Sequence, residues 1–419
     1  MSLLAKPTLP GWLPQVNPQV WILALGRFLS QTGSGFTVFY TAIFFVNEVG
    51  LSATAVGVAL GSSQVSGIAG RFLGGYLSDS EFCGRRGALL LSASLSAIAS
   101  LVIAAAYDFP TLVLGKLLIG LGYGFYYPGT EAIVADLTEE GDRSEAFALT
   151  RLGDNIGLQL GIVLAGILIS TTGVSRGLFV INGLFFLAFF GVVYFALEET
   201  YKPDAISDDT KIEKEVKNRW LVAFSDRLLL TFVAVNLLFT FYFSHIHSTL
   251  TIYLSKFGNF SPTIISGLFS WHITLSVVLQ LPVAKLLDRL SRPNALTISA
   301  LLWGVGFVVI DFIGLVETGN LLLAILALGF LAIAGIIYAP TESALIADLS
   351  PPNLRGIYSS INSQSWAIGY LIGQPLGGWA LDSSPAIINC FWLGMAASVI
   401  IAMVILQYLD KRIEIGNRE

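Results

Sequence analysis

The chain is long, apolar and poor in charge. It has 419 residues, of which 54% are apolar and 12% are charged, with 23 Lys and Arg against 28 Asp and Glu. A soluble domain carries about 25% charged residues, so this composition excludes a disordered chain and leaves too little polar surface for one large soluble fold. The net charge of −5 is spread over loops and gives no reason to expect a nucleic-acid partner. Two cysteines are too few for a disulfide framework or a Cys-rich zinc site.

Repeated apolar stretches are long enough to cross a lipid bilayer. A helix needs about 20 predominantly apolar residues to span the hydrocarbon core. Such windows occur in chain order at 18–45, 51–78, 86–107, 109–136, 146–170, 176–198, 227–254, 262–287, 294–314, 321–347, 357–381 and 386–409. The sequence therefore predicts an all-α membrane protein with twelve transmembrane helices. The first stretch has no small-residue cleavage site, so we expect it to remain as a span.

One connection differs from the other, shorter loops. Residues 199–226 contain a dense mixture of acidic and basic side chains and divide the spans six and six. We expect an N-terminal six-helix half at 1–198, a cytoplasmic linker at 199–226 and a C-terminal six-helix half at 227–419. The linker is either solvated or, over 211–220, forms a charged helix on the membrane surface.

The basic residues indicate the orientation in the membrane. When the loops are assigned to alternate sides, most Lys and Arg fall on one face, and only Arg176 and Lys256 fall on the other. Arg27, Arg71 and Lys116 lie inside spans. By the positive-inside rule, both termini and the linker are expected on the cytoplasmic side.

The two halves of the sequence repeat each other. A shift of 212 residues aligns Tyr126 with Tyr338 and Asp136 with Asp348, together with several prolines, alanines and glycines, without a gap. An even number of spans separates the copies, so the halves have the same orientation and form two pseudo-symmetric six-helix bundles. Such a duplication is typical of secondary transporters that expose a midplane site alternately to each side. The alternative is a duplication that serves stability alone.

The loop after the second span carries a recognisable motif. The motif begins with Gly75 and Asp79 and continues with Gly84, Arg85 and Arg86. A shorter version, with Asp288 and Arg289, follows the eighth span. These residues resemble the loop signature of the major facilitator superfamily. Lys116 begins a stretch of span 4 that is similar to another motif of that family, which normally begins with Arg. The resemblance implies a cytoplasmic latch in which an acid at a helix end meets a basic loop and gates the transporter.

Spans 5 and 11 contain regularly spaced glycines, which let helices approach closely. The stretch in span 5 resembles the antiporter motif of the drug–proton branch, with Ile162 in place of the usual proline. The runs 241–254 and 271–280 also look most like the twelve-span bacterial multidrug branch, which implies a bacterial inner membrane. The expected packing residues are Gly157, Gly161, Gly166, Gly369, Gly373 and Gly378.

Ionisable residues inside the spans are the candidates for proton coupling. Arg27, Glu131 and Asp154 lie at similar depth in spans 1, 4 and 5. If these helices are neighbours, as the family resemblance implies, the three form one buried cluster in which one carboxylate binds a proton. The alternative is a static ion pair that braces the first half. Glu342, one position from Glu131 in the repeat, has no obvious basic partner and is a second candidate.

Polar side chains on spans 1, 7 and 8 form helical stripes that suit a water-filled cavity. His245 and His247 are about 200° apart on a helix, so they do not form a metal pair. A role in proton transfer is one interpretation of His247 and His272, and a hydrogen-bonded contact between helices is the alternative. The expected cavity residues are Gln31, Tyr126, Tyr127, Asn236, Phe243, His247, Trp271, His272, Gln280 and Trp366.

Together these features predict a secondary transporter that exports amphiphilic small molecules in exchange for protons by alternating access. We expect a monomer in the lipid bilayer, with no cofactor, no metal and no enzymatic activity, since the chain has no phosphate-binding loop for ATP. The nearest alternative is a proton symporter or facilitator for a polar metabolite such as a sugar or an organic acid. A membrane receptor or scaffold is a remote alternative.

Overall fold

The computed structural model describes residues 16–138, 143–173, 175–201, 221–287, 290–316, 319–351 and 354–416. Within these ranges the chain is helical and contains no β-strand. The first-half helices are α1 (Pro18–Thr37), α2 (Tyr40–Asn47), α3 (Ala53–Ser78), α4 (Gly84–Ala104), α5 (Phe109–Leu137), α6 (Arg143–Thr172) and α7 (Gly177–Ala196). The second-half helices are α9 (Arg227–Ile246), α10 (Thr249–Lys256), α11 (Pro262–Leu287), α12 (Arg292–Ile313), α13 (Asn320–Leu349), α14 (Arg355–Asp382) and α15 (Pro385–Gly416).

The helices match the twelve expected spans, which confirms the predicted fold class. Span 1 is divided into α1 and α2 at Val38–Phe39, and span 7 into α9 and α10 at His247–Ser248. The other ten spans are single helices. The predicted linker lies largely outside the described residues, which resume at Leu221.

Nine segments of the described chain are long and apolar enough to cross a membrane by length and composition. The spans outside this set are α1–α2, α3 and α14, and their sequences show why. For instance, α3 carries Ser62, Ser63, Gln64 and Arg71 among its glycines, which lowers its mean hydropathy. These less apolar helices all contribute to the junction between the two halves.

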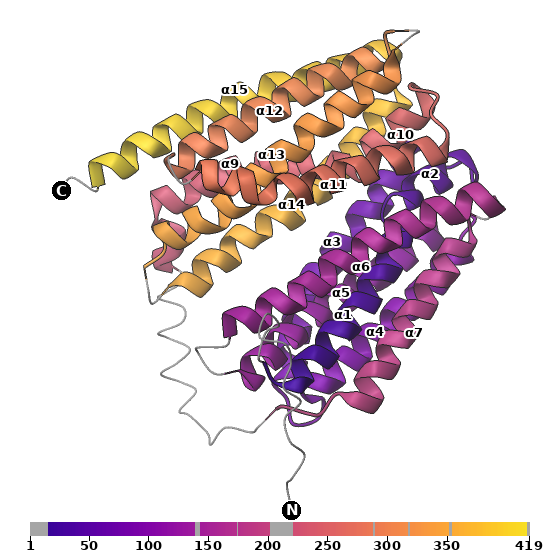
Figure 1. Ribbon diagram of the computed structural model, residues 1–419, viewed down its shortest axis with the longest axis vertical. Coiled ribbons are helices and arrows are strands. Elements are labelled where there is room, and N and C mark those ends of the chain that lie inside the picture. Colours follow the sequence, from indigo (N-terminus) through magenta and orange to yellow (C-terminus); the bar gives the residue numbers. More distant parts are fainter. Residues whose placement is uncertain are drawn as a thin grey trace, which may run out of the picture.

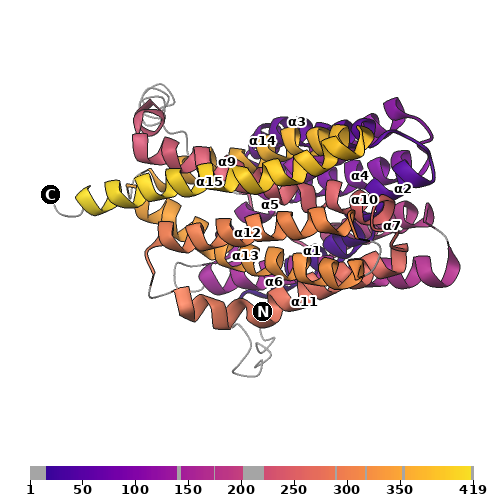
Figure 2. The ribbon, with the colours of Figure 1, turned by 90° about the horizontal axis from the view of Figure 1, so that it is seen from above.

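The helices form two bundles, α1–α7 and α9–α15 (Figure 1). Between the bundles, α3 packs on α14, α6 packs on α11, and α2 meets α10. Figure 2 shows the α3–α14 pair on one side of the molecule and the α6–α11 pair on the other. The first pair joins spans 2 and 11 and the second joins spans 5 and 8, so the repeat relates one pair to the other.

Glycines permit close approach at these helix crossings. A Cβ atom on Gly157 or Gly161 would overlap the α1 backbone, and one on Gly369 or Gly373 would overlap α9. Gly166 and Gly378 instead lie between the halves, against Ser266 of α11 and against the Ala53 backbone of α3 respectively. Because the shift of 212 residues relates the members of each glycine pair, the duplication preserves both the contacts within the halves and those between them.

Candidate functional site

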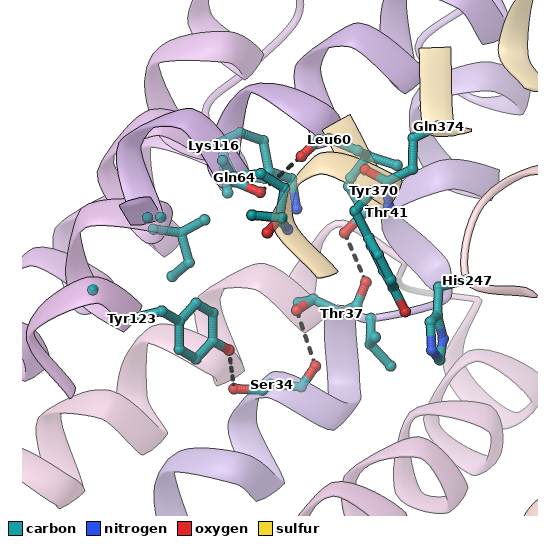
Figure 3. A pocket seen from close by; sticks show the side chains of 18 of the residues that line it. Ser34, Thr37, Thr41, Leu60, Gln64, Lys116, Tyr123, His247, Tyr370 and Gln374 are labelled. Carbon is teal, nitrogen blue, oxygen red and sulfur yellow. Dashed lines mark hydrogen bonds between the residues drawn. The ribbon is translucent and has the colours of Figure 1, made fainter. Parts of the chain in front are cut away.

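A cavity of about 350 Å³ lies between the halves. Helices α1, α3, α5, α6 and α7 of the first half form most of its wall, and His247 with Ala367, Tyr370 and Gln374 of α14 contribute from the second half. Figure 3 shows Lys116 and Gln64 together on one side of this cavity, with Tyr370 and His247 on the other.

Hydroxyl groups along α1 and α2, the two helices of span 1, are held by hydrogen bonds within the wall. The hydroxyls of Tyr123 and Ser34 are 2.6 Å apart, which links α5 to α1. Thr41 donates to the Thr37 carbonyl at 2.7 Å, and Thr37 donates to the Ser34 carbonyl at 3.2 Å (Figure 3). Backbone carbonyls accept the protons of these α1 and α2 hydroxyls, which therefore act only as acceptors. Ser34 accepts from Tyr123, and Thr37 accepts from Asn182 at 3.4 Å.

Two cations face the cavity without a carboxylate partner among the described residues. Lys116 of α5 and Arg71 of α3 are half-buried and line the wall. The Arg71 guanidinium lies 5.7 Å from the centre of the Tyr127 ring. A cation in contact with lipid at mid-bilayer costs about 2.5–3.5 kcal/mol on insertion scales, so both charges depend on cavity water or a ligand.

A buried ion pair lies in the same half. The Arg27 Nε donates to Asp154 Oδ1 at 3.0 Å, and a terminal guanidinium nitrogen pairs with Oδ2. The Tyr126 hydroxyl also donates to Asp154 Oδ1, at 2.9 Å, and Arg27 lies over the Tyr126 ring. Arg27 is only 4% exposed. The structure therefore brings two of the three expected coupling residues together and adds Tyr126 as the third member.

The expectation that Glu131 joins this cluster is corrected by the structure. Its side chain is exposed and contacts neither Arg27 nor Asp154 through a hydrogen bond or ion pair. The physical reason is helical phase: Tyr126 and Glu131 are five positions apart in α5, which places them about 140° apart around the axis. When Tyr126 faces Asp154, Glu131 faces away from it.

The second half contains a chain of amides at the related place. Tyr338 donates to the Asn236 Oδ1, and Asn236 donates to the Asn362 Oδ1 at 2.8 Å. Asn362 in turn donates to Glu342, which also accepts a hydrogen bond from Ser343. Tyr338, the repeat partner of Tyr126, thus meets an amide where Tyr126 meets a carboxylate.

The expected cavity residues divide into groups. Gln31, Tyr127 and His247 line the cavity. The His247 ring lies 5.1 Å from the Phe39 ring and 6.3 Å from the Tyr370 ring, so the two divided spans meet at this wall. The structure places the other seven outside the lining, and this corrects the expectation. They are Tyr126, Asn236, Phe243, Trp271, His272, Gln280 and Trp366.

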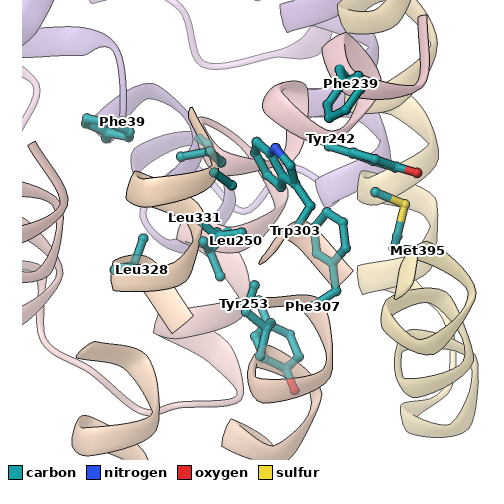
Figure 4. Close-up of a cluster of buried hydrophobic side chains, with 14 of the residues drawn as sticks. Phe39, Phe239, Tyr242, Leu250, Tyr253, Trp303, Phe307, Leu328, Leu331 and Met395 are labelled. Atoms are coloured by element: carbon teal, nitrogen blue, oxygen red, sulfur yellow. The ribbon is translucent and has the colours of Figure 1, made fainter. Parts of the chain in front are cut away.

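The physical reasons for these corrections are contacts within the bundles. In α11, the Trp271 Nε1 donates to the Ile325 carbonyl at 3.3 Å, His272 Nδ1 is 3.0 Å from the Leu328 carbonyl, and Gln280 is exposed. The rings of Phe243 and Trp366 lie 5.4 Å apart in a tilted arrangement within the aromatic interior of the second half. Figure 4 shows that interior around the fully buried Trp303.

Several cavity residues were missing from the sequence-based prediction. Lys116 is expected at the gate, and Arg71 is identified from the sequence only as a cation inside a span. Gln64, Asn182, Tyr370 and Gln374 were not singled out, although each is a polar or aromatic residue within an apolar span. For Gln64, Tyr370 and Gln374 the available signal is the low hydropathy of α3 and α14, which marks helices that face something other than lipid. Asn182 lies in the apolar helix α7 and has no such signal.

The motif loop ties the first half together at one end. Arg85 pairs with Asp79 at the end of α3 and, at 3.2 Å, with Asp136 at the end of α5. The backbone N–H groups of Arg85 and Arg86 donate to Glu199 at 3.0 and 3.1 Å. We call this set, Asp79, Arg85, Arg86, Asp136 and Glu199, the loop network.

Other gate residues are placed differently. Gly75 has no heavy atom within 4 Å of a Cβ built on it, so close packing does not require glycine there. Asp288 and Arg289 lie outside the described residues. In the second half, Arg292 lies 3.8 Å from Asp348, the repeat partner of Asp136, and both are exposed. Lys116 lies in the cavity wall and not in the loop network.

The opposite end joins the two halves. Asp382, at the end of α14, accepts hydrogen bonds from the backbone nitrogens of Ala53 and Thr54 at 2.9 and 2.7 Å and from the Thr54 hydroxyl at 2.6 Å. We call this contact the Asp382 cap. At the α6–α11 pair, Tyr40 of α2 forms a second contact between the halves, a hydrogen bond to Ser266 of α11.

The Asp382 carboxyl lies just beyond the expected eleventh span, and its contacts affect its titration. Burial by itself raises its pKa, but the hydrogen bonds from Thr54 and Ala53 outweigh burial and lower the pKa overall. The two bundles are in contact at the end of the molecule that contains α2 and α10, where the ionised Asp382 cap joins α14 to α3. They diverge toward the end that contains the loop network (Figure 1).

Comparison with known proteins identifies the family. Residues 23–258 and 246–418 each match the Major Facilitator Superfamily, so one match falls on each half. The chain belongs to the major facilitator superfamily. It is an integral membrane transporter of that family.

Relatives of this transporter extend over almost all of it. An uncharacterized MFS-type transporter of Bacillus subtilis, YttB, is 24% identical over 94% of the chain and 95% of the relative. A multidrug resistance protein of Yersinia enterocolitica, MdtH, is 22% identical over 94% of this chain and 95% of its own.

Solved structures share the fold at lower identity. A POT family transporter in complex with 5-aminolevulinic acid superposes with a TM-score of 0.78 at 14% identity, over 96% of this chain and 99% of that one. The nucleoside transporter NupG superposes with a TM-score of 0.77 at 15% identity, over 94% of this chain and 100% of its own.

Proposed function

We propose that this transporter exports amphiphilic small molecules in exchange for protons. The observation that carries the proposal is a cavity between the halves, closed at one end by the Asp382 cap, with the buried Arg27–Asp154 pair in the same bundle. The similarity to multidrug resistance proteins from Yersinia and Photorhabdus supports export as the direction.

In this proposal the loop network faces the cytoplasm of a bacterial inner membrane, together with both termini. The conformation is then open to the cytoplasm, and the Asp382 cap closes the outer end. Two six-helix halves, 1–198 and 227–419, rock about the cavity as one monomer. Opening to the outside requires the Asp382 cap to break and α3 to separate from α14.

Asp154 is the preferred proton carrier. Protonation of Asp154 removes the charge that holds Arg27, so the ion pair and its geometry change together. Glu342 is the second candidate because Asn362 and Ser343 stabilise it without a basic partner in the described chain. Glu131 is the third, since it is exposed on α5.

Proteoliposomes with an imposed pH gradient test the coupling. The probes are radiolabelled 2-naphthoate and 2-naphthamide, and an internal pH dye reports proton movement. We expect accumulation that follows the gradient in the wild type and is lost in Asp154→Asn, while gradient-free exchange persists. Accumulation that ignores the gradient, or survives Asp154→Asn combined with Glu342→Gln, contradicts the coupling proposal.

A second function, symport or facilitated transport of a polar metabolite, has one observation in its favour. The α1 side of the cavity presents hydroxyls, and Gln31, Gln64 and Gln374 supply amides that suit a polar solute. The direction of movement distinguishes the two proposals. Protons and solute move together in symport and in opposite directions in the preferred mechanism.

A further inference from the structure

The charges of the cavity are all of one sign. Lys116 and Arg71 line it, and no Asp or Glu appears among its described lining residues. Lys116 forms no hydrogen bond or ion pair with a described residue, and the Arg71 guanidinium has only the face of the Tyr127 ring. The cavity is therefore electropositive and has two cations available to a ligand.

The carboxylates of the surrounding helices are committed elsewhere or face away. Asp154 is held by Arg27 and Tyr126, and Glu342 is held by Asn362 in the other half. Glu131 is exposed and outside the lining. No described side chain is therefore placed to neutralise Lys116 or Arg71 when the cavity is empty.

The rest of the wall suits an apolar body. Ile68, Ile119, Leu158 and Phe179 line the cavity together with the rings of Tyr123 and Tyr127. Flat aromatic ligands are well accommodated by such rings. A volume of about 350 Å³ is within the range of pockets for small organic ligands.

We propose that the transported molecule is an anionic amphiphile, an aromatic or apolar body with a carboxylate, sulfonate or phosphate group that binds Lys116 and Arg71. This inference deepens the proposed export function and rests on it. Arg71 supplies a planar fork that can bind an oxyanion with two hydrogen bonds, and Lys116 adds a mobile point charge. An interior-negative membrane potential favours outward movement of such an anion.

Equilibrium dialysis of the purified full-length protein in lipid nanodiscs tests the proposal with a matched pair of probes, 2-naphthoate and 2-naphthamide. The probes share their ring and differ in charge. We expect naphthoate to bind at least about tenfold more tightly than the amide, since charge-assisted hydrogen bonds are the stronger ones.

Variants assign the preference to the two cations. Lys116→Gln should reduce the naphthoate preference to less than about threefold, Lys116→Arg should retain it, and Arg71→Gln should reduce it in part. Lys411→Gln, which removes the same charge from an exposed site near the end of α15, should leave the preference unchanged.

Several results would overturn the inference. These are equal binding of the two probes by the wild type, no naphthoate binding at millimolar concentration, or an unchanged preference in Lys116→Gln. The ratio of the two probe affinities is measured on the wild-type protein, so the proposal can be overturned even if a variant fails to fold. The measurement uses no proton gradient. A loss of coupling in the flux assay with naphthoate binding intact therefore overturns proton exchange alone.

Discussion

The two halves of this transporter share a frame but differ in chemistry. Tyr126 and Tyr338 occupy related places, and each donates a hydrogen bond toward its neighbouring helices. In the first half the acceptor is Asp154, paired with Arg27, whereas in the second half it is Asn236, bonded to Asn362. A duplicated scaffold can thus hold a buried ion pair in one copy and a pair of hydrogen-bonded amides in the other. The half with the charges also supplies most of the cavity wall.

The largest effect should come from breaking the charged pair. Asp154→Asn leaves the buried Arg27 guanidinium without its counter-ion, which costs about 3–5 kcal/mol of stability. Arg27→Gln combined with Asp154→Asn imitates the amide pair of the second half and should recover most of that loss. SDS titration of the purified protein measures both. If the double variant is as unstable as Asp154→Asn alone, an amide pair cannot replace the ion pair, and the two halves are not structurally equivalent at this place.

The glycines between the halves should give the next largest effect. Gly378→Ala places a methyl group against the Ala53 backbone, which cannot move aside easily, and overpacking of this kind costs about 1–3 kcal/mol. Gly166→Ala meets the Ser266 side chain and should have a smaller effect. Both changes should favour separation of the halves near α2 and α10.

Spin labels at exposed residues of the two halves, Thr171→Cys and Lys256→Cys, measure this separation. The native Cys83 and Cys390 are replaced by serine in these proteins. Gly394→Ala in α15 is the control, because a Cβ there meets open space. If the distance between the spin labels is the same in Gly378→Ala as in the Gly394→Ala control, the α3–α14 crossing does not determine how closely the two halves approach.

The two repeat-related tyrosines should differ by about 1 kcal/mol. Tyr126→Phe removes a hydrogen bond to a carboxylate, a loss of about 1.5–3 kcal/mol, whereas Tyr338→Phe removes one to a neutral amide, a loss of about 0.5–1.5 kcal/mol. SDS titration of the two single variants gives the difference directly. A larger loss of unfolding free energy in Tyr338→Phe than in Tyr126→Phe would contradict the conclusion that the charged acceptor lies in the first half.

The smallest effect concerns pH at the Asp382 cap. Its pKa is lowered from an ordinary value near 3.9, so the carboxylate stays ionised and the cap stays intact above about pH 4, weakening only as the pH falls through the lowered pKa. Asp382→Asn should loosen the contact between α14 and α3 by about 0.5–2 kcal/mol, as the loss of a helix cap does. The spin-label difference between wild type and Asp382→Asn should therefore be the same at pH 8 and pH 5. A difference that vanishes at pH 5 would contradict an ionised cap.

The sequence predicted the fold well because bilayer thickness fixes the length of each span. It did not predict the divisions at Val38–Phe39 and His247–Ser248, since an average over 20 residues does not register a two-residue break. Arg27 and Asp154 were expected together because a buried charge requires a partner. Glu131 was included on depth alone, which ignores the direction of a side chain around its helix.

The same limitation explains the residues of α11. His272 forms part of a polar stripe and Trp271 is its aromatic neighbour, but periodicity shows only that a face is not lipid-like. Here both side chains contact carbonyls of α13. Conversely, Tyr370 and Gln374 of α14 face the cavity in a helix of low hydropathy. Which polar face meets water and which meets a neighbouring helix depends on tertiary packing.

The modest hydropathy of α3 and α14 has a consequence for biogenesis. The insertion machinery partitions each segment between water and lipid as it leaves the ribosome, and segments with polar side chains enter lipid with less favourable free energy. A span such as α3 is synthesised long before α14, against which it packs in the finished protein. Its retention in the membrane therefore depends first on α4 and α5, which follow it and contact it within the same half. The helices that separate in the proposed mechanism are thus the ones whose insertion relies most on their neighbours.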